Sequence, residues 1–409
     1  MMRTVLVLGG GLTQCDAIAS ARRLGLRVVV ADGNPHAPGM VLDDEGVVSV
    51  TVSFTAVDEL LAELERRGLH VDAVLPYGSD LSVLPASRVA RRLGCAGIDL
   101  DPATACTDKV EMRRRWRAAG LPVLPHAVAT TASEARRAAL ELGLPVVVKP
   151  PDNAAQRGVQ LVTEPAALDD AAAEALANSP SGRVLVEQYV EGPEIAVTTF
   201  SSSGVTATIQ VTDRVTGPPP YLGICLAHVY PSELPPDELA AVEELLPRAA
   251  DSLGVTDGPT YSQVRLRDGV PYVLETGARL GGGRDSELRH LMSGQDAIAV
   301  HLRLLMGETI DVSTELDPAA LVGGGCVQFL TAPPGRLVAV HGLEGALAAS
   351  GVRNTAFFYE TDQVVPPLSS GAARVGYLIA TGRDRAEAVE RAAAASAMLR
   401  FEIDPPARR

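Results

Sequence analysis

Hydrophobic runs alternate with amphipathic segments over the first hundred residues of the chain. Apolar runs at residues 4–10, 27–35 and 71–78 predict buried strands, and the segments between them have helical spacing. Strands that alternate with helices form a parallel sheet covered on both faces. The pattern therefore predicts a Rossmann-like α/β domain, with ligands beyond the carboxyl ends of its strands.

After Gly97 the pattern changes to helices mixed with strand pairs. Asp101 followed by proline predicts the start of a helix, with Asp101 as the N-cap. The segment LPVVVKPP predicts a buried strand that ends in Lys149, and Tyr261–Gly277 predicts a hairpin. A long alanine-rich helix is expected over about residues 384–399. We expect this second part of the chain to be α+β.

The composition excludes several classes of protein. The 409 residues are 46% hydrophobic and 21% charged, which is enough apolar material for a large core. The net charge of −14 is the wrong sign for a non-specific binder of nucleic acid or anionic membranes. No apolar run reaches the ~18 residues that span a bilayer, and the apolar N-terminus is typical of a first strand, not a signal peptide.

The five cysteines are scattered and never spaced CxxC, which argues against a disulfide framework or a zinc site. We therefore expect a cytoplasmic protein without nucleic-acid or membrane partners.

Lysine is almost absent from the chain. Of the 36 basic residues only Lys109 and Lys149 are lysine, and the other 34 are arginine. A chain that uses arginine wherever either cation serves should keep lysine where a compact ammonium is needed. The alternative is that two surface lysines were retained by chance.

The glycines at Gly9–Gly11 invite comparison with a dinucleotide-binding turn, with Asp32 as the acid on the ribose. However, the third glycine of GxGxxG would fall on Gln14. An NAD-dependent oxidoreductase would also leave the two lysines unexplained. An NAD site at Gly9–Gly11 is therefore an alternative to the function favoured by the rest of the sequence.

Four features that suit ATP chemistry follow one another along the chain. The first is Lys149 at a strand end, followed by a flexible loop with Arg157 and Gly158, which could fold over phosphates. The second is VEQYVEGPE, in which Glu187 and Glu194 flank a segment whose backbone could bond a purine edge.

The third feature is a pair of oxygen-bearing side chains, Gln263 and Glu275, on the two strands of the predicted hairpin. Oxygen ligands from neighbouring strands suit Mg²⁺, which keeps water and nucleotide oxygens as its other ligands. The fourth is ETGARLGGGRDSE, whose consecutive glycines allow close approach of the backbone to a charged ligand.

In this order the four features resemble the ATP-grasp superfamily of carboxylate–amine ligases, over nearly the whole chain. The members that look most similar are the L-amino-acid (dipeptide) ligases and the biotin carboxylase-like branch. The resemblance implies a Rossmann-like domain over residues 1–105, an ATP-grasp domain over 106–310 with a lid at about 122–186, and a C-terminal part over 311–409 that completes the fold. The implied activity joins a small-molecule carboxylate, activated as an acyl phosphate, to an amine, with ATP and Mg²⁺ as cofactors. Amino acids are the expected substrates, and a homodimer is left open.

The resemblance also assigns roles to individual residues. Arg279 looks like the arginine that holds the substrate carboxylate and its acyl phosphate. The other assignments are the phosphate lysines Lys109 and Lys149, the lid-loop residues Arg157 and Gly158, the adenine hinge at Glu187, Tyr189 and Val190, the ribose acid Glu194, and the metal ligands Glu275 and Gln263. Lys149, Arg157 and Arg279 are the expected catalytic groups.

This sequence departs from the family pattern at two positions. Gln263 stands where an acid is usual, and the pattern E-x-N-x-R reads Glu275-Thr276-Gly277-Ala278-Arg279, so the asparagine ligand is missing. The number of magnesium ions is therefore open. Asp285 or Glu287 could supply a second acid, or could simply begin a solvated helix.

The substrate pocket is expected to involve Tyr77–Asp80, Pro218–Tyr221, Gly281–Arg289 and the C-terminal strands. Arg284 and Arg289 would suit a carboxylate-bearing second substrate, or could be surface arginines. Two alternatives share the ATP site: an enzyme that activates bicarbonate, and a nucleotide-binding protein without turnover.

Overall fold

A four-stranded parallel sheet opens the chain in the computed structural model, which describes residues 2–154, 156–217 and 223–405. Its strands are β1 (Thr4–Leu8), β2 (Arg27–Ala31), β3 (Val47–Val50) and β4 (Ala73–Pro76), in the order β3-β2-β1-β4, and its helices are α1 (Gln14–Arg23), α2 (Val57–Arg66) and α3 (Val83–Leu93). Strand alternation turns Val5 and Val7 toward α1, and Leu6 and Leu8 toward α2 and α3. The predicted Rossmann-like fold is confirmed.

Two short helices, α4 (Leu100–Ala105) and α5 (Lys109–Ala118), lead out of this sheet. The prediction that Asp101 caps a helix was wrong, because α4 begins at Leu100 and Asp101 lies in its first turn. Its carboxylate instead pairs with Arg115 of α5, 2.6 Å away. Helix α5 is capped by Asp108, whose side chain accepts from the backbone N–H groups of Val110 and Glu111.

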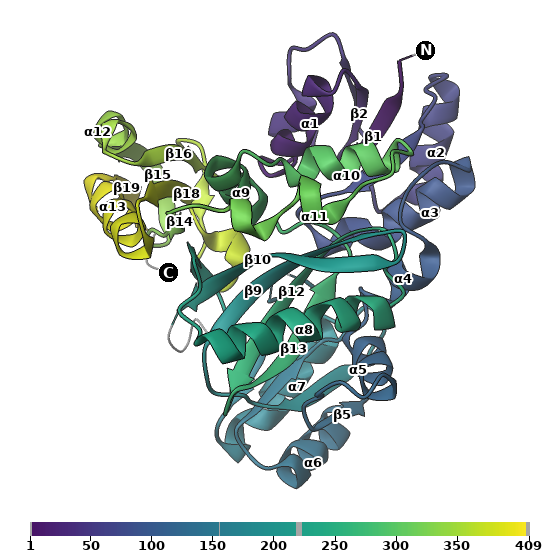
Figure 1. Cartoon of the computed structure of the whole chain (residues 1–409). Helices are drawn as coiled ribbons and strands as arrows, with labels where there is room; N and C mark the ends of the chain where they lie inside the picture. Colours follow the sequence, from purple (N-terminus) through teal and green to yellow (C-terminus); the bar gives the residue numbers. More distant parts are fainter. Residues whose placement is uncertain (1, 155, 218–222, 406–409) are drawn as a thin grey trace.

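The part of the chain predicted to be a lid, called the lid hereafter, is a small antiparallel sheet with two helices on it, at the bottom of Figure 1. Its strands are β5 (His126–Ala129), β6 (Val146–Lys149), β7 (Gln160–Val162) and β8 (Val184–Gln188), in the order β5-β8-β6-β7, and its helices are α6 (Ala132–Leu142) and α7 (Leu168–Ala177). Apolar side chains of both helices pack against β6 and β8 in one buried cluster. Strand β6 is the predicted buried strand, and it ends on Lys149.

An eight-stranded antiparallel sheet forms the centre of the molecule (Figure 1). In spatial order its strands are β13 (Val270–Gly277), β12 (Gly258–Arg267), β9 (Glu194–Ser202), β10 (Val205–Thr216), β11 (Cys225–Tyr230), β14 (Gly324–Leu330), β18 (Gly376–Gly382) and β16 (Val352–Phe357). Strands β12 and β13 are the predicted hairpin. Helices α8 (Pro236–Ser252) and α13 (Arg385–Met398) each cover part of the sheet, and α13 confirms the predicted alanine-rich helix.

The remaining elements are helices α9 (Asp285–Ser293), α10 (Ala297–Leu305), α11 (Val312–Glu315) and α12 (Leu343–Ala348), a small sheet of β17 (Val364–Val365), β15 (Gly335–His341) and β19 (Arg400–Asp404), and the 3₁₀ turns Pro38–Met40, Asp80–Ser82, Pro165–Ala167, Pro318–Ala320 and Gly371–Ala373. Leu302 of α10 shares one buried cluster with Val5 of β1 and Phe200 of β9. This cluster joins the N-terminal sheet to the central sheet. The domain boundaries at residues 105 and 310 stay predictions, and the central sheet continues across the second of them.

Candidate active site

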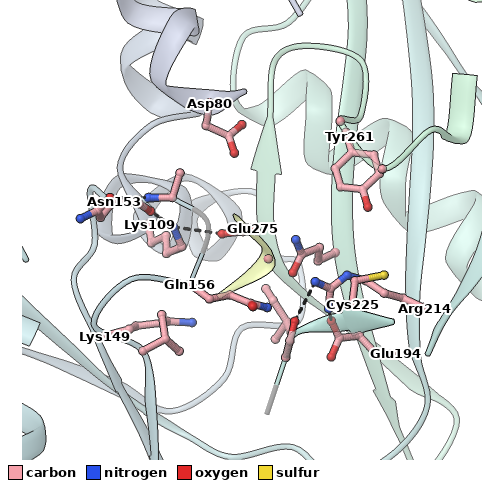
Figure 2. A pocket seen from close by; sticks show the side chains of 18 of the residues that line it. Asp80, Lys109, Lys149, Asn153, Gln156, Glu194, Arg214, Cys225, Tyr261 and Glu275 are labelled. Atoms are coloured by element: carbon pink, nitrogen blue, oxygen red, sulfur yellow. Dashed lines mark hydrogen bonds and ion pairs between the residues drawn. The ribbon is translucent and has the colours of Figure 1, made fainter. Parts of the chain in front are cut away.

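A cavity of ≈ 510 Å³ lies where the lid, the central sheet and the N-terminal part meet (Figure 2). The lid contributes Lys149, Asn153, Gln156 and Glu187–Val190 to its lining, and the central sheet contributes Glu194, Arg214, Cys225, His228, Tyr261, Gln263, Arg265 and Glu275. Gly78–Asp80 of the N-terminal part, Lys109, Arg279 and Arg374 complete the charged and polar lining. The structure thus brings both lysines of the chain to one cavity.

Lys109 and Glu275 form an ion pair at one side of the cavity, with Nζ and Oε2 3.0 Å apart (Figure 2). The same ammonium donates to the carbonyl of Asn153 in the lid loop, at 3.1 Å. Burial by itself would raise the pKa of Glu275. The charge of Lys109, with help from Lys149 and Arg214, outweighs burial and lowers that pKa to about 2.

Lys149 is held by a buried carboxylate. Its Nζ lies 2.7 Å from Oε2 of Glu187, and Arg113 of α5 makes two hydrogen bonds to the same carboxylate, at 2.7 and 3.0 Å. Burial lowers the pKa of Lys149, while the two cations overcome burial to bring the pKa of Glu187 to about 2. Glu187 therefore fixes Lys149 with its side chain, which leaves only its backbone for a purine.

Glu194 lies between two arginines that the sequence analysis did not single out. Arg265 stands opposite Glu194 in the β12–β9 register and approaches its carboxylate to 2.8 Å, and Arg214 contacts the other oxygen. Arg265 also donates to the carbonyl of Val190, at 2.9 Å, and so ties the predicted hinge segment to the sheet. Among the described residues, no backbone partner is found for the Val190 N–H.

Gln263 and Glu275 are direct partners in the β12–β13 register, and both line the cavity. Gly277, the position of the missing asparagine, is crowded by Asp80: a side chain there would clash with its Oδ1. That oxygen is buried and has no hydrogen-bond partner among the described residues. The donor set is thus one amide and two carboxylates. It fits Mg²⁺, which is bound through one or two carboxylates together with substrate phosphates.

Arg279 is buried and pairs with Asp80, with Nη2 and Oδ2 2.7 Å apart. Its guanidinium lies 5.1 Å from the centre of the Tyr261 ring. Within the described part of the chain, the buried Nε of Arg279 has no hydrogen-bond partner. The role of Arg279 toward a substrate carboxylate stays a prediction.

The lid loop differs from the prediction. Arg157 is exposed, its Nε donates to the carbonyl of Ala154 at 3.3 Å, and it is not among the residues that line the cavity. Gln156 lines the cavity instead, from a backbone with φ of 64°. Gly158 is buried beside Asn178 outside the lining. In this conformation the loop does not bring Arg157 to the two lysines, because the turn carries its side chain outward.

The predicted substrate arginines have other partners. Arg284 is buried between Asp16 and Glu287, 4.3 Å above the Tyr377 ring, and Arg289 is buried on the carbonyls of Ile209 and Asp317. Neither is among the residues described as lining the cavity, and neither is a surface arginine.

The suggestion that Asp285 or Glu287 supplies a second metal acid stays a prediction, and neither residue is among those described as lining the cavity. Asp285 pairs with His228 at 3.2 Å, and Glu287 contacts Arg284 and Asn354. The predicted pocket segment Pro218–Tyr221 lies outside the described residues.

Comparison with known proteins identifies two family models along the chain. Residues 142–287 match the model of the ATP-grasp domain, and residues 328–404 match that of the L-amino acid ligase C-terminal domain 2. The chain therefore contains an ATP-grasp domain. The L-amino acid ligase from Bacillus licheniformis has the same fold, with a TM-score of 0.85 and 18% identity over 98% of this chain and 99% of that one.

Two further proteins are similar to this chain. The biotin carboxylase domain of a Hydrogenobacter thermophilus 2-oxoglutarate carboxylase, solved with MgADP, ADP and bicarbonate, shares the fold with a TM-score of 0.79 and 18% identity, over 98% of this chain and 91% of that one. A D-alanine–D-alanine ligase from Anaeromyxobacter is 30% identical over 131 residues, which are 32% of this chain and 42% of that ligase.

The described residues form no helix that combines the length and the apolar character needed to cross a bilayer. They also hold no cluster of three or more histidine, cysteine or acidic side chains arranged to bind a metal.

Proposed function

We propose that this protein activates the carboxylate of an amino acid with ATP and joins it to an amine, releasing ADP and phosphate. The observation that carries the proposal is the meeting of Lys109, Lys149, Glu275 and Arg279 in one cavity. Two ammonium groups suit phosphates, and an arginine whose Nε lacks a partner in the described part of the structure suits the acid. The C-terminal match to L-amino acid ligases supports amino acids as the substrate class.

In this proposal the nucleotide lies between lid and sheet. The Val190 N–H, with no backbone partner found among the described residues, would bond the purine edge. Glu194 would face the ribose, and the two lysines would contact the phosphates. Lys109 reaches the lid loop through the Asn153 carbonyl and Glu275 through its ion pair, so it couples lid position to the metal-binding carboxylate.

Magnesium would be held by Glu275 and Gln263, with Asp80 Oδ1 as a further oxygen. When bound, it would neutralise charge on the phosphates during transfer. Lys109 now occupies part of the Glu275 carboxylate, and phosphate oxygens would draw that ammonium away. The single amide at Gln263 makes this a less anionic site than one with two glutamates on the hairpin.

The chemistry then proceeds in two steps. A carboxylate oxygen of the substrate attacks the γ-phosphorus, ADP leaves, and an acyl phosphate forms. The acyl group then passes to the amine nitrogen, phosphate departs, and the amide remains. Arg279 orients the carboxylate and then its phosphate, while closure of the lid excludes water that would hydrolyse the acyl phosphate.

Measurement of ADP release against a panel of L-amino acids, alone and in pairs, tests the proposal. We expect amino-acid-dependent ADP release, amide products, and hydroxamates when hydroxylamine replaces the amine. Lys149→Ala should lose this activity, and Arg137→Ala on the exposed face of α6 should keep it. ADP release that depends on bicarbonate and not on any amino acid would instead identify a carboxylating enzyme. Nucleotide binding without turnover would contradict both.

A further inference from the structure

A cysteine and a histidine meet on β11 inside the same cavity. Sγ of Cys225 lies 3.3 Å from Nε2 of His228, and both residues line the cavity. Three residues apart on a regular strand, they would point to opposite faces of the sheet. The β10–β11 register shifts between Val215 and Thr216, so one extra residue is inserted on β11 between them. The bulge turns both side chains toward the cavity, a use that bulges near active sites often have.

An acid fixes the histidine from behind. Nδ1 of His228 lies 3.2 Å from Oδ1 of Asp285, the first residue of α9, and Thr212 donates its hydroxyl to the same oxygen at 3.2 Å. The side chains of Cys225, His228 and Asp285 are all buried. Nε2 of His228 is therefore directed at the thiol. The arrangement is that of a nucleophile (Cys225), a base (His228) and an acid that orients the base (Asp285).

The glycine segment keeps the thiol side of the histidine open. A side chain at Gly283 would come within 2.5 Å of Nε2 of His228 and within 3.0 Å of Asp285. Gly283 and Gly282 both line the cavity. The space above the Cys225–His228 contact is therefore free for a substrate group.

Positive charge surrounds the thiol. Burial would raise the pKa of Cys225, but His228, Arg214 and Arg374 outweigh it and lower that pKa. Burial likewise opposes charge on His228, and Asp285 and Cys225 raise the pKa of that imidazole. Tyr261 and Cys326 are the other titratable groups that face the thiol.

The other four cysteines of the chain lack such surroundings. Burial raises the pKa of Cys15, Cys95, Cys106 and Cys326, and for Cys326 it reaches about 12. Cys225 is thus the one thiol of the five whose pKa is lowered, and it is the one that contacts an imidazole.

The thiol shares its charged surroundings with the proposed phosphate-transfer site. Glu194, Cys225, Tyr261 and Glu275 all raise the pKa of Arg214, against burial, so that guanidinium lies among them. Figure 2 shows Cys225 beside Arg214, on the side of Glu275 away from Lys109. An acyl group held by Arg279 would lie in the same cavity as the thiol.

We propose that Cys225 is a nucleophile that accepts the acyl group before the amine does, an inference that rests on the proposed function. The thiolate attacks the carbonyl carbon of the acyl phosphate, the C–O bond to phosphate breaks, and phosphate leaves as a thioester forms. The amine then attacks the thioester carbon, the C–S bond breaks, and the thiolate is regenerated. The amine's proton passes to the imidazole of His228, which has lost its own proton to the departing phosphate.

Alkylation of the protein as it stands tests the thiol without any substrate. Iodoacetamide at pH 6, followed by peptide mass analysis, should label Cys225 at least tenfold faster than the other four cysteines. His228→Gln should slow that labelling at least tenfold and leave Cys15 and Cys95 unchanged. Labelling of Cys225 no faster than that of Cys326 would overturn the activated thiol.

Acyl trapping tests the transfer itself. The enzyme is incubated with ATP and a mixture of radiolabelled L-amino acids, denatured in acid and digested. Acid-stable, hydroxylamine-labile radioactivity should appear on the Cys225 peptide only when ATP is present. Cys225→Ala should lose the label and at least 90% of amide formation, with its melting temperature retained.

The outcomes separate this inference from the proposed function. Normal ADP release and amide formation with no radioactivity on Cys225 would overturn acyl transfer alone. Full amide formation by Cys225→Ala would overturn it as well. Failure of the same mixture to stimulate ADP release in the parent would overturn the proposed function and, with it, the acyl transfer, whatever the alkylation shows.

Discussion

Two carboxylates on different strands hold the two lysines of this chain. Glu187 of β8 binds Lys149, and Glu275 of β13 binds Lys109. An arginine at position 149 would place its planar guanidinium group beside that of Arg113, which already makes two hydrogen bonds to Glu187. Lysine is thus retained where only one donor has room.

Replacement of Lys149 tests this reading. Lys149→Ala should lower ATP-dependent turnover by roughly 10²–10³-fold, as expected when one electrostatic contact to a transferring group is removed. Glu187 keeps Arg113, so the melting temperature should change little. Lys149→Arg should be almost as inactive, and steady-state ADP release measures both. An arginine variant with most of the parent activity would show that the scarcity of lysine has no functional cause at this position.

The amide at Gln263 gives a prediction for magnesium. Gln263 stands opposite Glu275 in the hairpin, so Gln263→Glu adds a negative charge to the proposed metal site. An anionic oxygen attracts a dication more strongly than an amide dipole does. The magnesium concentration at half-maximal ADP release should fall, by about tenfold for each ~1.4 kcal/mol of added magnesium-binding free energy. Glu275→Gln should abolish turnover. An unshifted half-saturation in a folded Gln263→Glu protein would remove position 263 from the site.

At the scale of elements, the site depends on how the segment after β8 turns into β9. Gly192 has a φ of 145°, and a side chain there would clash with the carbonyl of Leu266 in β12. The residue lies between the hinge at Val190 and the acid at Glu194. Any displacement of the backbone at this point therefore moves both groups that would contact the nucleoside.

Substitution of Gly192 separates steric clash from backbone strain. Gly192→Ala should lower the affinity for ADP at least tenfold in calorimetric titration and lower the melting temperature. Gly204→Ala is the matched control, because Gly204 also has a positive φ, 76°, but has open space around it. The control should carry only the strain, about 1–3 kcal/mol, with ADP affinity intact. Equal losses of affinity would contradict a special role for the segment.

The elements were predicted well where hydrophobic periodicity is strong. Strands β1, β2, β4 and β6, the β12–β13 hairpin and helix α13 follow directly from it. Strand β3 was not predicted, because three of its four residues are only half-buried at the edge of the parallel sheet. The same periodicity locates the ends of strands, so it also identified Lys149 and Glu275 as candidate site residues near the ends of β6 and β13.

Partners far apart in the chain could not be predicted in this way. Arg113 is one of four arginines in a single helix, and nothing in its spacing distinguishes it from the exposed Arg114. Asp80 reaches Arg279 across 199 positions of sequence. The bulge that joins Cys225 to His228 is equally invisible in sequence, because it depends on the register against β10.

At the scale of the whole molecule, buried ion pairs between elements make stability depend on pH. The pKa of Glu187 is lowered to about 2 in the folded state from an ordinary value near 4.5. A lowered carboxyl pKa gives stability that is present above the unfolded pKa and is lost as the pH falls through the folded one. The pair of Glu187 with Lys149 and Arg113 should therefore stabilise fully above about pH 5 and weaken progressively toward pH 2.

Glu187→Gln measures this contribution. At pH 7 the variant should be less stable by about 3–5 kcal/mol, since two buried cations lose their partner. Between pH 5 and 3 it should lose less stability than the parent does, because the titrating group is gone. Glu63→Gln is the control: its pKa is also about 2, but its partner Arg66 is exposed, so urea denaturation curves should barely change. Parallel pH profiles for Glu187→Gln and the parent would contradict the prediction.

The pairing of strands β11 and β14 also limits where this chain can be joined to a related chain in a chimeric protein. Strand β11 carries Cys225 and His228. Its neighbours in the sheet are β10 and β14, and β14 belongs to the C-terminal part of the chain. A chimera that takes its C-terminal third from a relative must therefore supply a strand that restores the pairing of His228 with Val327. A crossover placed between β13 and β14 would replace the cavity residues that come from the C-terminal part of the chain. It would also replace the strand that pairs with β11, and so could shift the backbone that carries the Cys225 thiol. Substrate range and chemical competence would then be inherited together.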